Sequence, residues 1–534
     1  MKRTLALALL TAGIAAAQWG GSLRFCLHAE PRTLHPLEAD DQSSETVRYL
    51  TGGVLIRINR YTQELDAGLA RSWKVSDGGA RITFKLRQGV RFSDGSPFSA
   101  ADVAYTIREL NNPALHSAVA DEFRGTKAEI LAPDTVAVRF PTQVSGTERL
   151  FDDLAILSSS AVDKDKAVLG PFVPREYKPG IYLQLDRNPN YWKTGPGGRR
   201  LPYLDSIRLD IQQNREIELL RFRRGEVQLI NKLEPEYFER LAAEDRASAQ
   251  NAGPSFDSEQ MWFNQVSGAP IPEYRKAWFR SKNFRNAISH SIHREDLVKI
   301  AFQSLATPAA GPISPANHFW YNQTLKPRAY DPAAAQRLFA QDGFRKQGSG
   351  MVDSSGHPVE FSIATNAGNT TRAKMAALIQ QDLAKVGIDV RVVTLDFPSL
   401  IERIGRTYQY DACLLGTANV DLDPNGQRNI WLSSSANHQW NPSQKAPATA
   451  WEAEIDRLMQ AQASAIDPVR RKASFDRVQQ IAWEQEPFLY LVYKNALAAI
   501  GANVRNAKAA VLYPHAYWNA DQIQLNAQLA RAVP

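Results

Sequence analysis

The chain has 534 residues, of which 63 are lysine or arginine and 56 are aspartate or glutamate, so its formal net charge at pH 7 is +7. This length exceeds the roughly 250 to 300 residues that one hydrophobic core supports, and it predicts two or three domains. The basic residues are dispersed, without the clusters and interleaved aromatic residues that nucleic-acid binding requires, so we expect no nucleic-acid partner.

The first residues have the pattern of a secretory signal. Residues 2–3 are basic, residues 5–14 form a short apolar run, and three alanines follow at 15–17. The run is shorter than the roughly 20 apolar residues of a membrane-spanning helix, and it predicts cleavage after Ala17. No lipobox precedes Cys26. We expect a periplasmic or secreted protein without a lipid anchor, with a retained signal anchor as the alternative.

A strand and a proline-bracketed loop follow the signal. Alternating apolar residues predict the strand at 22–28. The loop begins with two prolines within 31–36 and leads into a helix that we expect to begin near Glu45. The polar residues that complete this loop are Asp40, Asp41 and Gln42.

Residues 65–107 have the clearest local pattern of the chain. Residues 82–86 alternate between apolar and polar, which predicts a half-buried strand, and Asp77-Gly78-Gly79 before them predicts the turn of a hairpin. Ser99 and Asp102 have the spacing of a capping box, so a helix is expected to begin there.

This unit is similar to a segment of the family 5 extracellular solute-binding proteins, the cluster C receptors of ABC importers. Further motifs along the chain resemble the same family. They are Gly170-Pro171-Phe172 with the turn that ends in Tyr191-Trp192, Gly225-Glu226-Val227, Phe263-Asn264 with the helix pattern of 284–298, and Tyr330-Asp331-Pro332. The resemblance covers nearly the whole mature chain, and it is specific to the family without being specific to a cargo.

The resemblance implies an α/β fold of the type II periplasmic-binding-protein kind, a Venus flytrap with the three lobes of cluster C and mixed sheets. A strand, helix and strand expected between 360 and 394 agree with it. The implied boundaries are 1–17 for the signal peptide, 18–56 plus 166–266 plus 490–534 for domain I, 57–165 for the β-rich domain II, and 267–489 for domain III. The chain is expected to cross between lobes near 264–272 and 488–500.

Motifs of catalysis are missing from the sequence. It contains neither a Gly-x-Ser-x-Gly elbow nor a His-Glu-x-x-His helix. Cys26 and Cys413 each lie in an apolar run and are expected to be buried free thiols. We therefore expect a binding protein with no catalytic residues, no cofactor and no metal ligands, and keep a secreted hydrolase as the alternative class.

Two loops and several aromatic residues supply the candidate binding site. The loop after Gly416 is similar to a family segment in which an Asp pairs with the amino group of a bound peptide. A gapless reading places Val420 at that position, and Asp421 one residue later is the candidate partner of a cationic group. Asp423 and Pro424 are expected to begin a helix or turn. The candidate ligand-binding residues are Asp40, Asp41, Gln42, Trp262, Thr417, Ala418, Asn419, Asp421, Trp431 and Trp440, with the last two as aromatic walls of a cleft.

The resemblance implies a receptor that captures oligopeptides by lobe closure and delivers them to the transmembrane permease subunits of an ABC importer. We expect it to act as a monomer. An oligosaccharide, an opine-like conjugate and a chelated metal remain alternative cargoes. A sensor that presents solute to a membrane signalling partner is a further alternative.

Overall fold

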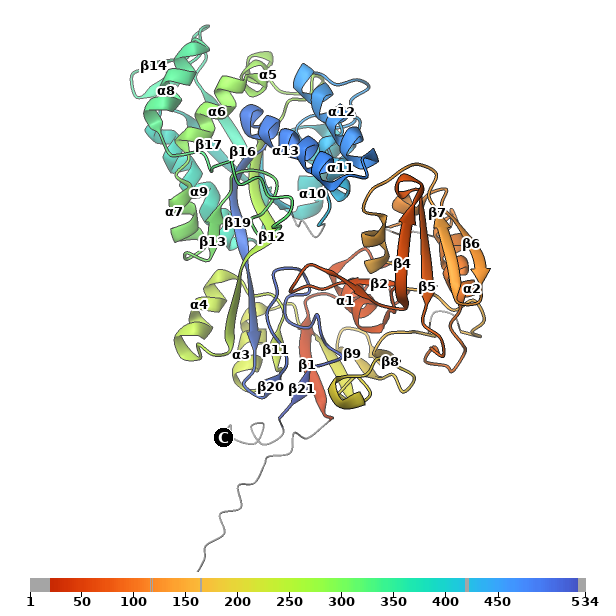
Figure 1. Ribbon diagram of the computed structural model, residues 1–534. Helices are drawn as coiled ribbons and strands as arrows, with labels where there is room; N and C mark the ends of the chain where they lie inside the picture. Colours follow the sequence, from red (N-terminus) through yellow and green to blue (C-terminus); the bar gives the residue numbers. More distant parts are fainter. Residues whose placement is uncertain (1–19, 116, 118, 164–165, 418–421, 527–534) are drawn as a thin grey trace, which may run out of the picture.

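The computed structural model describes residues 20–526 except 116, 118, 164–165 and 418–421 (Figure 1). The predicted signal peptide and the candidates Ala418, Asn419 and Asp421 therefore lie outside the described residues. Among the helices that are described, none has both the length and the apolar character needed to cross a membrane.

One large mixed sheet runs through the centre of the molecule. Its strands follow the order β17-β16-β18-β12-β19-β11-β1-β10-β9-β8, and β13 pairs with β19. Their bounds are β1 Ser22–Leu27, β8 Phe172–Lys178, β9 Tyr182–Arg187, β10 Ser206–Ile211, β11 Leu229–Ile230, β12 Ala249–Phe263, β13 Ala306–Pro308, β16 Glu360–Asn366, β17 Asp389–Leu395, β18 Ala412–Thr417 and β19 Leu489–Ile500. Parallel pairs such as β1 with β10 and β16 with β17 occur beside antiparallel ones, as predicted for a mixed sheet.

The long strands β12 and β19 join the two halves of this sheet. Residues 249–251 of β12 pair with β19 close to β11, whereas residues 258–261 pair with both β19 and β18 and residues 262–263 with β18 alone. Between these two parts of β12 the register with β19 shifts on each side of Pro254. In Figure 1 the two strands run side by side from the lower part of the molecule to the upper part. The first crossing therefore lies at about 251–258, some residues earlier than the expected 264–272.

A second sheet of four antiparallel strands forms a separate β-rich lobe. Its order is β4 (Ala70–Ser76), β5 (Arg81–Leu86), β7 (Thr135–Arg139) and β6 (Lys127–Ala132). The helix α2 (Ala100–Leu110) begins at Ser99, whose side chain accepts from the Ala101 amide while Asp102 accepts from the Ser99 amide at 2.7 Å. The predicted hairpin and capping box are both confirmed.

Helices cover both halves of the large sheet. They are α1 (Gln42–Thr51), α3 (Arg215–Arg223), α4 (Pro235–Glu244), α5 (Glu273–Arg280), α6 (Lys282–Ser291), α7 (Arg294–Asp296), α8 (Pro332–Gln341), α9 (Thr370–Lys385), α10 (Phe397–Glu402), α11 (Arg428–Trp431), α12 (Ala450–Ser464) and α13 (Pro468–Gln485). The helix pattern of 284–298 is divided: α6 ends at Ser291 and α7 begins at Arg294, whose buried guanidinium donates to the carbonyls of Ser289 and Tyr490.

Short two-stranded sheets complete the described chain. They are β2 (Ile56–Ile58) with β3 (Leu65–Ala67), β14 (Arg345–Gln347) with β15 (Gly350–Val352), and β20 (Val504–Arg505) with β21 (Gln524–Leu525). We use three names below: the N-terminal lobe (β1, β8–β11, α1, α3 and α4), the β-rich lobe (β4–β7 and α2) and the C-terminal lobe (β16–β18 and α5–α13). The numerical domain boundaries given above stay a prediction.

Each lobe has its own apolar core, as burial of apolar surface requires. One core lies under the four-stranded sheet, one lies against β1 and β10, and two lie on the opposite faces of the C-terminal half of the large sheet. Cys26 and Cys413 are both buried and both free, as predicted. Burial raises the pKa of the Cys26 thiol to about 12.

Candidate functional site

A cleft of about 840 Å³ lies where the three lobes meet. We call it the central cleft. The N-terminal lobe and the segments packed on it contribute residues 36–49, Lys232, Asp257 and residues 512–515, the β-rich lobe contributes residues 140–153, and the C-terminal lobe contributes residues 422–428. Solute sites in proteins are usually concave, of roughly 300 to 1,000 Å³, and often lie between domains. The central cleft has both properties.

The candidates Asp40, Asp41 and Gln42 lie on the wall of the central cleft. Asp41 also has a local structural role, because its carboxylate accepts from the amides of Ser43 and Ser44 and so caps α1. The helix therefore begins at Gln42, three residues before the expected start. Asp40 is exposed and lies 3.3 Å from the Arg32 guanidinium.

The three candidate tryptophans do not line the central cleft. Trp262, Trp431 and Trp440 are 0%, 1% and 0% exposed and belong to one apolar core of the C-terminal lobe. Each indole N–H donates to a partner inside that lobe: Trp262 to the Tyr410 hydroxyl, Trp431 to Gln427 and Trp440 to Glu452. The expectation that Trp431 and Trp440 form walls of the cleft is wrong. Both rings pack inside the apolar core of the C-terminal lobe, and both indole N–H groups have acceptors there.

Thr417 is half-buried at the end of β18, and its hydroxyl accepts from the side-chain amide of Gln260. It is not among the residues that line the central cleft. The rest of the candidate loop lies outside the described residues until Leu422. Asp423 then caps the short 3-10 helix η7 (Pro424–Gln427), as predicted, and forms a bidentate pair with Arg471 at 2.7 and 2.9 Å.

Charged residues that the sequence did not single out hold the wall between the N-terminal and β-rich lobes. Asp152 lies 2.7 Å from Arg60 and accepts from the Ile58 amide. Burial by itself raises the pKa of the Asp152 carboxyl, but the guanidiniums of Arg60 and Arg57 outweigh it and hold this pKa below its usual range. The sequence around Asp152 does not reveal this pairing, because Arg57 and Arg60 lie some 90 residues away in the chain.

The floor of the central cleft is a second group of paired charges. Lys232 donates to Asp257 at 2.9 Å, and both side chains also line a smaller cavity of about 170 Å³ behind the cleft. Burial opposes ionisation of Asp257, yet Lys232 and Lys494 lower the pKa of its carboxyl. Burial and Lys232 together lower the pKa of the neighbouring His515 to about 4. These residues surround the crossing strands β12 and β19.

The β-rich and C-terminal lobes touch directly at one edge of the central cleft. The side-chain amide of Asn425 donates to the Ser145 carbonyl at 2.8 Å, and the Ser145 amide donates to the Ala463 carbonyl at 2.9 Å. We call this contact the lobe seam. It joins two lobes that are far apart in the sequence at one edge of the central cleft.

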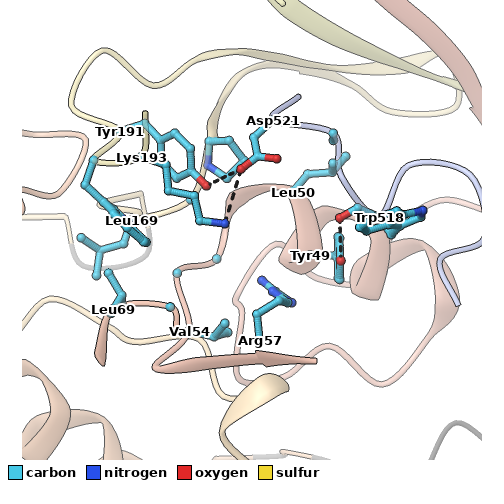
Figure 2. A pocket seen from close by; sticks show the side chains of 17 residues that line it. Tyr49, Leu50, Val54, Arg57, Leu69, Leu169, Tyr191, Lys193, Trp518 and Asp521 are labelled. Carbon is cyan, nitrogen blue, oxygen red and sulfur yellow. Dashed lines mark hydrogen bonds and ion pairs between the residues drawn. The ribbon is translucent and has the colours of Figure 1, made fainter. Parts of the chain in front are cut away.

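A smaller hollow of about 80 Å³ lies between the N-terminal and β-rich lobes (Figure 2). Its polar groups satisfy one another: Tyr191 donates to Asp521 at 2.9 Å, and Lys193 lies 3.5 Å from the same carboxylate. The Arg57 guanidinium lies over the Tyr49 ring, 4.4 Å from its centroid. Liquid water takes up about 30 Å³ per molecule, so this hollow has room for a few waters at most. It is a junction between lobes rather than a solute site.

Comparison with known proteins places these observations in a family. The model of the bacterial extracellular solute-binding proteins, family 5 Middle, matches residues 64–439. A probable ABC transporter-binding protein of Deinococcus radiodurans is 26% identical over 530 residues, which cover 89% of this chain and 87% of the relative. The glutathione-binding protein GsiB of Salmonella typhi is 25% identical over 485 residues, covering 88% of this chain and 89% of that protein.

Solved structures share the fold. The oligopeptide-binding protein AppA from Bacillus subtilis, in complex with a nonapeptide, has a TM-score of 0.74 and 22% identity and covers 95% of this chain and 99% of that one. NikA from Brucella suis, in complex with Fe(III)-EDTA, has a TM-score of 0.80 and 21% identity, and the match covers 95% of this chain and 100% of that one. The predicted type II binding-protein fold is thereby confirmed. Because the family model spans more than half of the sequence, the chain belongs to the bacterial extracellular solute-binding proteins of family 5.

Proposed function

We propose that this protein, as the solute-binding receptor of an ABC importer, captures oligopeptides in the central cleft and delivers them to the transmembrane permease subunits. The observation that carries the proposal is the cleft of about 840 Å³, which all three lobes line and which contains both apolar and charged side chains. The complex of AppA with a nonapeptide supports a peptide cargo on this fold. The complexes of NikA with Fe(III)-EDTA and of AgaA with agropinic acid keep a chelated metal and an opine-like solute as alternatives.

Capture is proposed to work by closure of the lobes about β12 and β19. A solute that contacts both sides of the cleft binds the closed state more tightly than the open one, and only this difference in affinity shifts the population. The lobe seam at Ser145 and Asn425 forms only when the lobes approach each other. The closed form is then the species that the permease recognises.

The family is extracellular or periplasmic, and we propose that this chain is exported and cleaved after Ala17 without a lipid anchor. The exported protein is expected to begin at Gln18 and to act as a monomer. Its relatives are binding proteins, and we propose that the cargo is released unchanged. The intact mass of protein recovered from the periplasm or medium checks the cleavage site and the absence of a lipid.

The proposal is tested by exposing purified protein to a tryptic digest of casein, removing free peptide and recording native mass spectra. We expect one peptide per protein, recovered at its original mass after the protein is unfolded. Small-angle scattering of the same samples should show a smaller radius of gyration when peptide is present, because the lobes close. Capture of sugars or opines in place of peptides, or recovery of cleaved peptides, would contradict the proposal.

A further inference from the structure

Two arginines on the wall of the central cleft differ from the other cations there. Arg48 pairs with Asp153, Arg60 with Asp152 and Lys232 with Asp257. By contrast, the side chains of Arg149 and Arg428 make no hydrogen bond or ion pair with any residue in the described ranges. Nη1 of Arg149 and Nε of Arg428 have no acceptor among those residues; Nε of Arg60 also lacks one, but the rest of that guanidinium pairs with Asp152. Arg149 and Arg428 are half-buried and line the central cleft, so an anionic group of a solute there can supply the counter-charge that the described residues do not.

The two arginines approach the cleft from opposite lobes. Arg149 lies in the 3-10 helix η3 (Thr147–Asp152) of the β-rich lobe, and Arg428 begins α11 in the C-terminal lobe. Arg149 lies four residues after Ser145, and Arg428 lies three residues after Asn425. Ser145 and Asn425 bond to each other at the lobe seam. That separation is about one helical turn. Both residues therefore lie close to the seam along the chain and line the same cavity.

The carboxylates of the cleft show the opposite pattern. Asp152, Asp257 and Asp423 each pair with a basic side chain, and Asp41 caps α1. The other acids that line the cleft, Asp40, Glu45, Glu122 and Asp153, have partners as well. Within the described part of the cleft, each acid therefore has a partner, whereas the side chains of Arg149 and Arg428 have none. An anion satisfies them, whereas a second cation leaves them unpaired.

We propose that Arg149 and Arg428 together bind a carboxylate of the cargo, such as the free carboxyl terminus or an acidic side chain of a peptide. The planar guanidinium matches a carboxylate with two parallel N–H donors, which a lysine cannot reproduce. A carboxylate held from both lobes contacts both arginines only after closure, so it supplies the difference in affinity that closure needs. This inference deepens the proposed receptor function and rests on it.

The test compares wild type with Arg149→Gln, Arg428→Gln and the double variant. The probes are a tryptic digest of casein and the same digest with its carboxyl groups methyl-esterified, and the readout is peptide capture in native mass spectra. Wild type should capture the free acids at least about tenfold better than the esters. Loss of one partner of a desolvated charge pair costs enough to weaken binding about 30-fold or more, so the double variant should lose capture of the acids and the preference over esters. Arg149→Lys should fall between wild type and Arg149→Gln.

The matched control is Arg139→Gln with Arg406→Gln, which removes the same charge from the same two lobes outside the cleft. Arg139 faces Asp77 and Glu129 on the exposed side of β7, and Arg406 pairs with Glu402 on the surface. This control should capture peptides as wild type does. Because the side chains of Arg149 and Arg428 bond to no described residue, their variants should also keep the wild-type melting temperature.

The outcomes separate the two proposals. Equal capture of acids and esters by wild type, or unchanged capture by the double variant, would overturn the role of the arginines and leave the receptor function standing. A wild type that captures neither mixture would overturn the peptide proposal itself, and the inference with it.

Discussion

His515 lies at the floor of the central cleft with 4% of its surface exposed. Its Nδ1 faces the Ala510 carbonyl at 2.9 Å, and Lys232 and Asp257 are the charged groups around it. Burial disfavours the imidazolium, Lys232 adds to that effect, and Asp257 opposes it only in part. The pKa of His515 therefore falls from 6.5 to about 4, and the ring is neutral in the folded protein at neutral pH.

This residue predicts a pH dependence of stability. Between pH 6.5 and 4 the unfolded chain binds a proton at position 515 that the folded protein does not, so the free energy of unfolding falls as the pH falls. The stabilisation is fully present above pH 6.5, and the loss reaches about 3 kcal/mol near pH 4. In urea unfolding at several pH values, the free energy of unfolding of His515→Asn should change less with pH in this window than that of the wild type. The His290→Asn variant, with a partly exposed ring, is the control and should keep the wild-type slope; equal slopes for all three proteins would contradict the prediction.

At the scale of elements, the junction of β12, β18 and α9 depends on one buried ion pair. Arg372 of α9 holds Glu259 of β12 with two bonds of 2.8 and 2.9 Å, and both side chains are at least nine-tenths buried. Gly416 of β18 lies against this pair: a methyl group there would be 2.7 Å from the Glu259 carboxylate and 2.8 Å from the Arg372 guanidinium. Strands and helix can approach only because position 416 lacks a side chain.

Gly416→Ala is therefore expected to destabilise the protein. The added methyl must displace the ends of a buried, hydrogen-bonded pair, and overpacking of this kind costs about 1 to 3 kcal/mol. Breaking the pair would add to that cost, because a buried charge would lose its partner. The free energy of unfolding in urea measures the effect. Gly268→Ala is the control, since no atom lies within 4 Å of a methyl group there; equal stability of the two variants would contradict the account.

At the scale of the whole molecule, the long strands β12 and β19 connect the two halves of the large sheet, and the lobe seam joins the β-rich and C-terminal lobes. Charged groups on those strands are paired: Lys494 lies near both Glu259 and Asp257. The lobe seam is different in kind, because we expect its hydrogen bonds to form only when the lobes close. Its contribution should appear in binding rather than in folding.

Asn425→Ala should shift the molecule toward the open form. The lost bond to the Ser145 carbonyl is worth about 1 kcal/mol, which weakens peptide affinity about fivefold, mainly through faster dissociation. Binding kinetics with a captured casein peptide and scattering of the free and bound protein provide the measurement. Asn283→Ala is the control, because it loses a bond of the same length to Asp342 inside one lobe. If both variants release peptide at the wild-type rate, the seam does not support closure.

Much of the local structure follows from residues that are close in sequence. The capping box of Ser99 and Asp102, the hairpin around residues 77–79 and the helix start at Asp423 depend on neighbours within a few positions, and the structure confirms all three. The β-α-β unit between 360 and 395 is confirmed for the same reason. The family resemblance identified the fold, because its motifs span the whole chain.

The candidate site was predicted only in part, since its properties depend on partners distant in the chain. The loop with Asp40, Asp41 and Gln42 reaches the cleft. Trp431 and Trp440 lie in the core instead, where Gln427 accepts from the indole of Trp431 and Glu452 accepts from that of Trp440. Arg149 and Arg428 look like ordinary surface residues in the sequence. Whether a charge is paired or free is decided by groups that folding brings within a few ångströms, and Coulomb interactions and desolvation act over that distance in space, whatever the separation along the chain.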